Sequence, residues 1–137
     1  MVFDITIKNG LPAIEKVTER FNSFAEKYHI DISIRRKMYV VFDEFLNNII
    51  SYAYNDDHEH DIDINVKLLN NQLVVTITDD GIPFDPFSTK SPETDSSIDE
   101  RELGGLGIHL VRNMMDKVSY QRKDDKNIVK LIKSLNP

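Results

Sequence analysis

The chain has 137 residues, 40% of them hydrophobic and 29% charged, which predicts one globular domain over residues 1–137 with a core of its own. A net charge of -6 and a pI near 5.1 argue against direct binding to nucleic acid, because such proteins gather Lys and Arg against the phosphate backbone. Apolar runs of about five residues are too short for a membrane span of about 20, and the absence of cysteine and of a signal-peptide pattern favours a cytoplasmic protein.

The first half of the chain is predicted to contain one strand and two helices. Apolar and polar side chains alternate over residues 2–8, as they do in a strand. Apolar residues then recur at helical spacing over residues 12–28. A longer helix with one broad apolar face is predicted from a cap at Ser33 to about Tyr54.

The second half is predicted to contain two hairpins, a long polar loop and one helix. The hairpins cover residues 62–77 and 118–132, the loop 80–103 and the helix 108–116. Asn-Asn and Asp-Asp pairs supply the turns of the hairpins. Loops longer than about 12 to 15 residues are usually functional lids or disordered segments, and the sequence leaves both open. Helices that cover one face of a sheet predict an α+β fold, a two-layer α/β sandwich.

Three of the five glycines, Gly104, Gly105 and Gly107, lie within four positions ahead of an apolar segment. They do not directly follow a strand, as a dinucleotide fingerprint requires, and the chain has no Gly-Lys-Ser or Gly-Lys-Thr of a Walker loop. A loop that runs into a helix N-terminus presents unpaired N–H groups and the positive end of the helix dipole, which favour an anion such as phosphate. The glycines therefore indicate either a phosphate site or a simple loop hinge.

Glu44 and Asn48 lie four positions apart on the longer predicted helix and so share a face at the edge of its apolar stripe. A hard cation such as Mg²⁺ binds few protein oxygens beside water and nucleotide phosphates, so one Asn carbonyl is a sufficient protein ligand. A carboxylate at Glu44 within reach of a hydroxyl nucleophile would act as a general base. Spacing alone favours the simpler interpretation, a solvated helix edge.

Asp79 and Gly81 lie where the first hairpin ends. An aspartate carboxylate can accept a hydrogen bond from the exocyclic amine of adenine, and glycine lets the backbone approach a flat ring without an intervening side chain. Alone, this segment fits an ordinary Asp-Gly turn better.

Together, the three segments resemble the N, G1 and G2 boxes of the GHKL ATPase superfamily, in the order and spacing of that superfamily. The boxes are residues 44–48, 79–86 and 104–111. The Phe-Asp-Pro after the G1 glycine and the segment after the G2 glycines are most similar to bacterial anti-sigma-factor serine/threonine kinases. The resemblance implies an α+β fold of the GHKL (Bergerat) type, with a mixed, mostly antiparallel sheet and helices on one face.

The resemblance also implies a role for each box. Glu44 would be the catalytic base and Asn48 the Mg²⁺ ligand. Asp79 would bind the adenine amine of ATP, with Gly81 beneath the ring. The three G2 glycines would wrap the phosphates, and the segment at about residues 82–104 would form an ATP lid.

Such kinases bind a sigma factor, phosphorylate a serine or threonine of its antagonist, the anti-anti-sigma factor, and are often homodimers. The resemblance therefore implies a protein serine/threonine kinase that acts as an anti-sigma factor with ATP and Mg²⁺. The same Glu44 and Asn48 would also serve ATP hydrolysis, and the alternative is a regulatory binding module whose nucleotide occupancy switches partner affinity without phosphotransfer. Two positions depart from the family pattern: Tyr52 stands where many relatives have histidine, and Asn127 lies near where relatives often have threonine.

Overall fold

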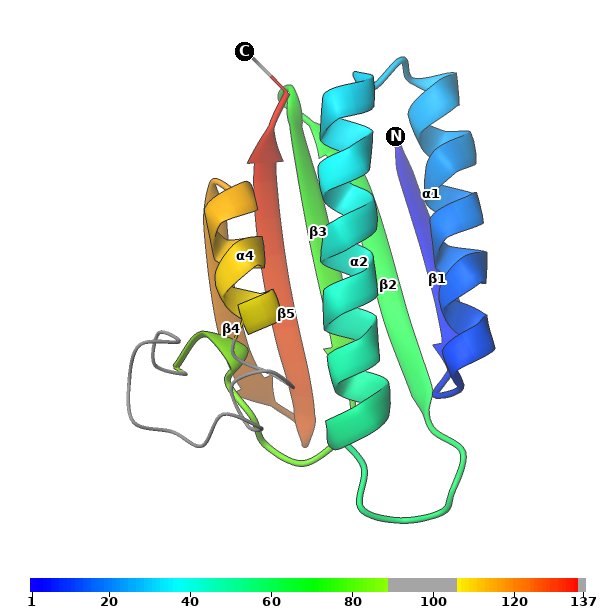
Figure 1. Cartoon of the computed structure of the whole chain (residues 1–137), viewed down its shortest axis with the longest axis vertical. Helices are drawn as coiled ribbons and strands as arrows, with labels where there is room; N and C mark the ends of the chain where they lie inside the picture. Colours follow the sequence, from blue (N-terminus) through cyan, green and yellow to red (C-terminus); the bar gives the residue numbers. More distant parts are fainter. Residues whose placement is uncertain (89–105, 136–137) are drawn as a thin grey trace.

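Figure 1 shows the computed structural model of the chain, which describes residues 1–88 and 106–135. In chain order its elements are β1 Val2–Lys8, η1 Leu11–Ala13, α1 Ile14–Lys27, α2 Ile32–Tyr52, β2 Asp61–Leu69, β3 Gln72–Asp79, η2 Pro86–Ser88, α4 Leu106–Met114, β4 Lys117–Lys123 and β5 Lys126–Ser134. The strand predicted at residues 2–8 is β1, and the helix predicted at residues 12–28 is the 3-10 turn η1 followed by α1. No helix in the described residues is both long and apolar enough to cross a membrane.

The strands form one sheet in the order β1-β2-β3-β5-β4. The α-helices cover one face of this sheet, with α2 between α1 and α4 (Figure 1). The predicted α+β, two-layer fold is therefore confirmed. A mixed, mostly antiparallel sheet was expected, and every strand pair within the described residues is antiparallel. Two of these pairs, β2-β3 and β4-β5, are hairpins, which join antiparallel strands with very short turns.

Both hairpins turn through residues in the left-handed backbone region. The φ angles are 52° at Asn70 and 60° at Asn71, and 53° at Asp124 and 61° at Asp125. A type I′ turn requires positive φ at both central residues, and Asn and Asp tolerate this conformation better than other residues with a side chain. The two turns predicted from the sequence are confirmed.

The cap predicted at Ser33 is wrong by two residues, because Asp31 caps α2. The Asp31 carboxylate accepts a hydrogen bond of 3.0 Å from the backbone N of Ser33, and the helix begins at Ile32. The Ser33 hydroxyl bonds to the same carboxylate. Both residue types cap helices well, but the residue just before the first helical turn is the one that reaches the unpaired N–H groups.

The core lies between the sheet and the helices. Alternate residues of each strand point into it, and in β3 these are Leu73, Val75 and Ile77, all fully buried. Asp79 continues this row at the end of the strand. In the described residues, Asp79 and Asn127 are the polar residues that are buried. Because burying a polar group is unfavourable unless it is hydrogen-bonded, the contacts of these two residues define a candidate site.

Candidate functional site

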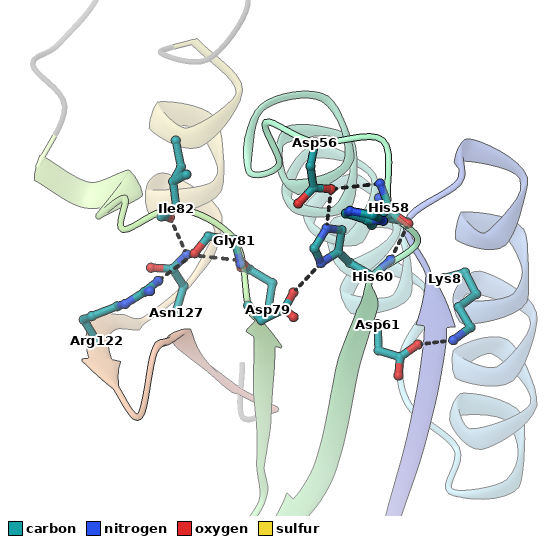
Figure 2. Close-up of polar contacts among 12 residues, drawn as sticks. Lys8, Asp56, His58, His60, Asp61, Asp79, Gly81, Ile82, Arg122 and Asn127 are labelled. Atoms are coloured by element: carbon teal, nitrogen blue, oxygen red, sulfur yellow. Dashed lines mark hydrogen bonds and ion pairs between the residues drawn. The ribbon is translucent and has the colours of Figure 1, made fainter.

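Asp79 is the last inward-facing residue of β3, and it is 5% exposed. Its Oδ1 accepts two hydrogen bonds, one of 2.9 Å from the backbone N of Gly81 and one of 3.0 Å from Nδ2 of Asn127. Asn127 lies directly opposite Asp79 in the register of β3 and β5, and Figure 2 shows the contact between them. The alternation that buries the core of β3 therefore also brings this carboxylate into the protein.

Burial raises the pKa of Asp79, because removal from water disfavours the charged carboxylate. The hydrogen bonds from Asn127 and Gly81 act in the opposite direction, since they stabilise the charged form. Within the described residues, Oδ2 of Asp79 accepts no hydrogen bond. An ionised carboxylate with one saturated oxygen is suited to accept an N–H donor of a ligand at the other oxygen.

Gly81 brings the loop after β3 against the C-terminal end of α2. A Cβ at this position would lie 2.5 Å from the backbone O of Ala53 and 2.6 Å from its Cβ, closer than such atoms approach. The backbone N of Ile82 donates to the same Ala53 oxygen at 2.8 Å, and Arg122 donates to the Gly81 oxygen at 2.8 Å. Packing against α2 thus requires the glycine, a reason that sequence analysis did not provide. The position of Gly81 beneath a base ring stays a prediction.

Asn127, which the sequence marks only as a departure from the family pattern, is a residue of the site. It is 4% exposed, donates to Asp79, and accepts a hydrogen bond of 2.6 Å from the hydroxyl of Tyr120. The available signal was its alternation with Val129 and Leu131, which puts an amide in an apolar row. The pairing of β3 with β5, which brings this amide to Asp79, has no local signature in the sequence.

Glu44 and Asn48 lie one turn apart on α2, as predicted, and both are half-buried. Neither makes a hydrogen bond or ion pair within the part of the chain that the structure describes. The neighbouring Asn47, by contrast, donates to the backbone O of Asp43 at 2.7 Å and to its Oδ1 at 3.1 Å. With a rise of about 1.5 Å per residue, Asn48 and Glu44 precede Ala53 by about 7.5 Å and about 13.5 Å along the helix. The two side chains therefore lie along the helix whose end contacts the Asp79-Gly81 loop.

Phe87 connects the loop after β3 to both α2 and α4. Its ring packs on Phe45 of α2, with ring centroids 5.9 Å apart, and its backbone O accepts a 3.3 Å hydrogen bond from Arg112 of α4. This part of the loop therefore lies beside the turn of α2 that carries Glu44.

The glycine cluster is only partly described. Gly107 lies in the first turn of α4, whose N-terminal end is at the same end of the molecule as the end of β3 (Figure 1). Gly104 and Gly105 lie outside the described residues, as do residues 89–104 of the predicted lid at 82–104. Their proposed contact with phosphate stays a prediction.

A second polar cluster surrounds His60, in the segment between α2 and β2 (Figure 2). Its Nε2 lies 2.7 Å from Oδ1 of Asp56, and its Nδ1 lies 3.1 Å from Oδ1 of Asp80. The hydrogen bond to Asp56 raises the pKa of His60, because two carboxylates stabilise a ring with both nitrogens protonated. The ring stacks on Tyr54 with centroids 4.2 Å apart. No sequence pattern predicts this cluster, because histidine and aspartate in a polar segment are usually solvated. Tyr52, the other departure from the family pattern, is 47% exposed.

The residues of α2 fit a magnesium ion only as part of a complex with phosphate. In residues 1–88 and 106–135, no group of three or more His, Cys, Asp or Glu residues is arranged to hold a metal ion. Asn48 offers a half-buried amide without a competing hydrogen bond in these residues, and Mg²⁺ commonly takes one or two protein oxygens beside water and phosphate. Asn48 therefore fits as a single ligand.

Comparison with known families confirms the resemblance of the chain to histidine kinase-like ATPases. The family model of the histidine kinase-like ATPase domain matches residues 8–133. The serine/threonine-protein kinase BtrW of Bordetella bronchiseptica is 36% identical over 85 residues, which are 62% of this chain and 60% of BtrW. The serine-protein kinase RsbW of Bacillus subtilis is 31% identical over 87 residues, which are 60% of this chain and 54% of RsbW. The matches thus span less than two thirds of these relatives' length.

Solved structures support the fold. The structure of the RsbU and RsbW domains of Rv1364c from Mycobacterium tuberculosis matches 98% of this chain and 32% of that chain, with a TM-score of 0.72 and 12% identity. The blue-light activated histidine kinase EL346 of Erythrobacter litoralis matches 77% of this chain and 32% of that chain, with a TM-score of 0.57 and 20% identity. At these identities, the two structures show a shared fold.

Proposed function

Because the chain belongs to the family of histidine kinase-like ATPase domains, we propose that it binds ATP with Mg²⁺ at the end of the sheet that carries Asp79. The observation that carries this proposal is the buried Asp79 carboxylate. Its Oδ1 is saturated by donors from Gly81 and Asn127, so that Oδ2 is suited to accept the exocyclic amine of adenine.

The remaining roles follow the boxes. Gly81 lies beneath the adenine ring, and Asn48 is the protein ligand of Mg²⁺. The phosphates lie against Gly104, Gly105 and Gly107, where the first N–H groups of α4 and its dipole favour an anion. Residues 82–104 close over the nucleotide as a lid.

We further propose that the chain is a protein serine/threonine kinase. The names of BtrW and RsbW as protein kinases support this, as does the retention of both Glu44 and Asn48. Glu44 accepts the proton of the substrate hydroxyl. The oxygen of that hydroxyl forms a bond to the γ-phosphorus of ATP, while the bond between the γ-phosphorus and the leaving oxygen of ADP breaks. Bound Mg²⁺ supplies charge neutralisation on the phosphates. The role of the protein itself is to hold the substrate hydroxyl and the phosphates in line.

The resemblance to anti-sigma-factor kinases suggests the partners: a sigma factor, which the protein sequesters, and an anti-anti-sigma factor, which it phosphorylates. It also suggests a homodimer in the cytoplasm. A co-purification of the full chain with a candidate sigma factor, with and without ATP, measures the first of these interactions.

Transfer of label from γ-labelled ATP tests the kinase proposal. The full chain is incubated with Mg²⁺ and a candidate antagonist protein, and transfer to a serine or threonine is measured for the wild type, Glu44→Gln and the matched control Glu19→Gln, an exposed glutamate of α1. We expect transfer by the wild type and by the control, and a loss of at least about a hundredfold in Glu44→Gln. Equal transfer by Glu44→Gln would exclude Glu44 as the base. ATP binding without transfer to any antagonist would favour the regulatory binding module.

The magnesium ligand has a separate test. Asn48→Ala should weaken Mg²⁺-dependent ATP binding, whereas Asn47→Ala, which removes only a contact to Asp43, should not. Isothermal titration with and without Mg²⁺ measures the difference. Tight Mg²⁺-dependent binding by Asn48→Ala would exclude this role.

A further inference from the structure

Every hydrogen-bonding position of the Asn127 side chain has a partner. Nδ2 donates to Oδ1 of Asp79 at 3.0 Å and to the backbone O of Ile82 at 2.8 Å. Oδ1 accepts from the hydroxyl of Tyr120 at 2.6 Å and from the backbone N of Phe84 at 3.3 Å. A primary amide has two N–H donors and an oxygen with two acceptor positions, so each position is filled.

These partners also fix the orientation of the amide. The backbone O of Ile82 can only accept, and the backbone N of Phe84 can only donate, so an exchange of the amide oxygen and nitrogen would set like groups against each other on both sides. The nitrogen of Asn127 must therefore face Asp79. At the other end of the amide, the hydroxyl of Tyr120 donates to Oδ1 of Asn127. A hydrogen bond to the oxygen of an amide strengthens the N–H groups of the same amide as donors.

A fixed donor beside Asp79 determines what that carboxylate can recognise. A hydrogen bond to Oδ1 favours the ionised form, and an ionised carboxylate can only accept at Oδ2. An ionised Asp79 therefore attracts the exocyclic amine of a 6-amino purine and repels the carbonyl oxygen that a 6-keto purine carries in the same place, because that oxygen is also only an acceptor. A protonated Asp79 would lose this discrimination, because its O–H could donate to a keto oxygen.

We propose that Asn127, held by Tyr120, is the positioning residue that keeps Asp79 an acceptor and so sets the preference of the site for a 6-amino over a 6-keto purine nucleotide. This rests on the proposed binding of ATP at Asp79. It goes further, because it assigns the base preference to the amide of Asn127, near where relatives often carry threonine.

The test measures the affinities of ATP and inosine triphosphate, whose base has a carbonyl in place of the 6-amino group, for the full chain with Mg²⁺. The wild type should prefer ATP. In Asn127→Ala, ATP affinity should fall by about ten- to a hundredfold, the range expected for losing a hydrogen bond to a charged group, while the affinity for inosine triphosphate stays equal or rises. Asn127→Thr, whose hydroxyl can donate to Asp79, should recover part of the preference. Tyr120→Phe should shift the ratio in the same direction by a smaller factor.

The helices provide a matched control. The hydroxyl of Tyr39 donates to Oδ1 of Asn22 at 2.6 Å, the same contact between the same residue types but away from Asp79. Tyr39→Phe and Asn22→Ala should leave the ratio of the two affinities unchanged, and thermal melting establishes that each variant folds.

An equal loss of both nucleotides in Asn127→Ala, or an unchanged ratio, would overturn the proposal and leave Asn127 with a purely structural role. If Asn127→Ala does not fold, the ratio in Tyr120→Phe decides, and an unchanged ratio there would overturn it as well. A wild type that binds neither nucleotide would instead overturn the proposed function on which this inference rests.

Discussion

Asp79 and Asn127 are direct cross-strand neighbours at the ends of β3 and β5, and a hydrogen bond of 3.0 Å joins their side chains. Each continues a row of residues that faces the core. The sheet thus extends its buried face by one polar pair, and the loop that begins at Asp80 is attached to that pair through Gly81, Ile82 and Phe84.

The variant Asp79→Asn should change stability and nucleotide binding in opposite directions: stability rises relative to the wild type at higher pH, and ATP binding weakens. Burial raises the pKa of Asp79 in the folded state above the value near 3.8 that it has in the unfolded chain. The folded protein therefore binds the carboxyl proton of Asp79 more tightly than the unfolded chain does. The stability of the wild type therefore falls as pH rises from this value through the folded-state pKa. An amide at position 79 still accepts from Gly81 and Asn127 but carries no charge, so the variant should gain stability over the wild type as pH increases.

The same variant should bind ATP at least about tenfold more weakly, because an N–H group would replace the acceptor for the adenine amine. Chemical denaturation across this pH range and nucleotide titration give the two readouts. Asp57→Asn, at an exposed position, is the control and should alter neither. A pH-independent difference in stability between Asp79→Asn and the wild type would contradict the assignment of the titration to Asp79.

Gly81→Ala should destabilise the protein by about 1–3 kcal/mol, the usual effect of forcing extra atoms into a packed site. The added Cβ would lie 2.5 Å from a backbone oxygen of Ala53, which cannot move without disturbing the end of α2. Gly10→Ala is the matched control, since its Cβ would have Pro12 Cδ at 3.9 Å as its nearest neighbour. Urea unfolding compares the two variants. Equal stability would mean that the end of α2 adjusts freely.

Much of the fold followed from local sequence. The alternation of residues 2–8 predicted β1, and Asn-Asn and Asp-Asp pairs predicted both hairpin turns, because these patterns act over a few residues. The choice between Asp31 and Ser33 as cap did not follow, since both residue types are good caps and only the first helical residue decides between them.

The site was predictable only where a single segment carries it. Glu44 and Asn48 share a face of α2 because of helical periodicity, and Asp79 was placed at a strand end. The partner of Asp79 was not predicted, because the pairing of β3 with β5 depends on packing between distant segments. The contact of Gly81 with Ala53 has the same origin.

Tyr54→Phe should leave the protein equally stable or raise its stability by about 1 kcal/mol, because the Tyr54 hydroxyl is buried without a hydrogen-bond partner in the described residues. Burial, with the negative charge of Asp79 nearby, raises the pKa of this hydroxyl, so it stays protonated. Tyr39→Phe is the matched change at a hydroxyl that does have a partner, Asn22, and should lower stability by about 1 kcal/mol. Urea unfolding measures both. A marked loss of stability in Tyr54→Phe would indicate that the hydroxyl has a partner such as bound water.

The His60 cluster should make stability depend on pH near neutrality. The pKa of His60 is raised above 6.5 in the folded protein, with the hydrogen bond to Asp56 as the main cause. Its stabilising contribution is therefore complete below the unfolded value near 6.5 and is lost as pH rises through the folded-state pKa. Above that pH, the ring no longer carries a charge between Asp56 and Asp80.

The variant His60→Gln tests this dependence, because it cannot titrate. The thermal midpoint of the wild type should exceed that of His60→Gln most at about pH 5, and the difference should shrink as pH rises through the folded-state pKa of His60. His109→Gln, an exposed histidine of α4 outside the cluster, is the control and should leave the difference between the wild type and His60→Gln in place. Because Asp80 is the next residue after Asp79, the affinity for ATP should be measured over the same pH range. A difference between the wild type and His60→Gln that stays constant with pH would mean that His60 contributes by stacking on Tyr54 and not through its charge.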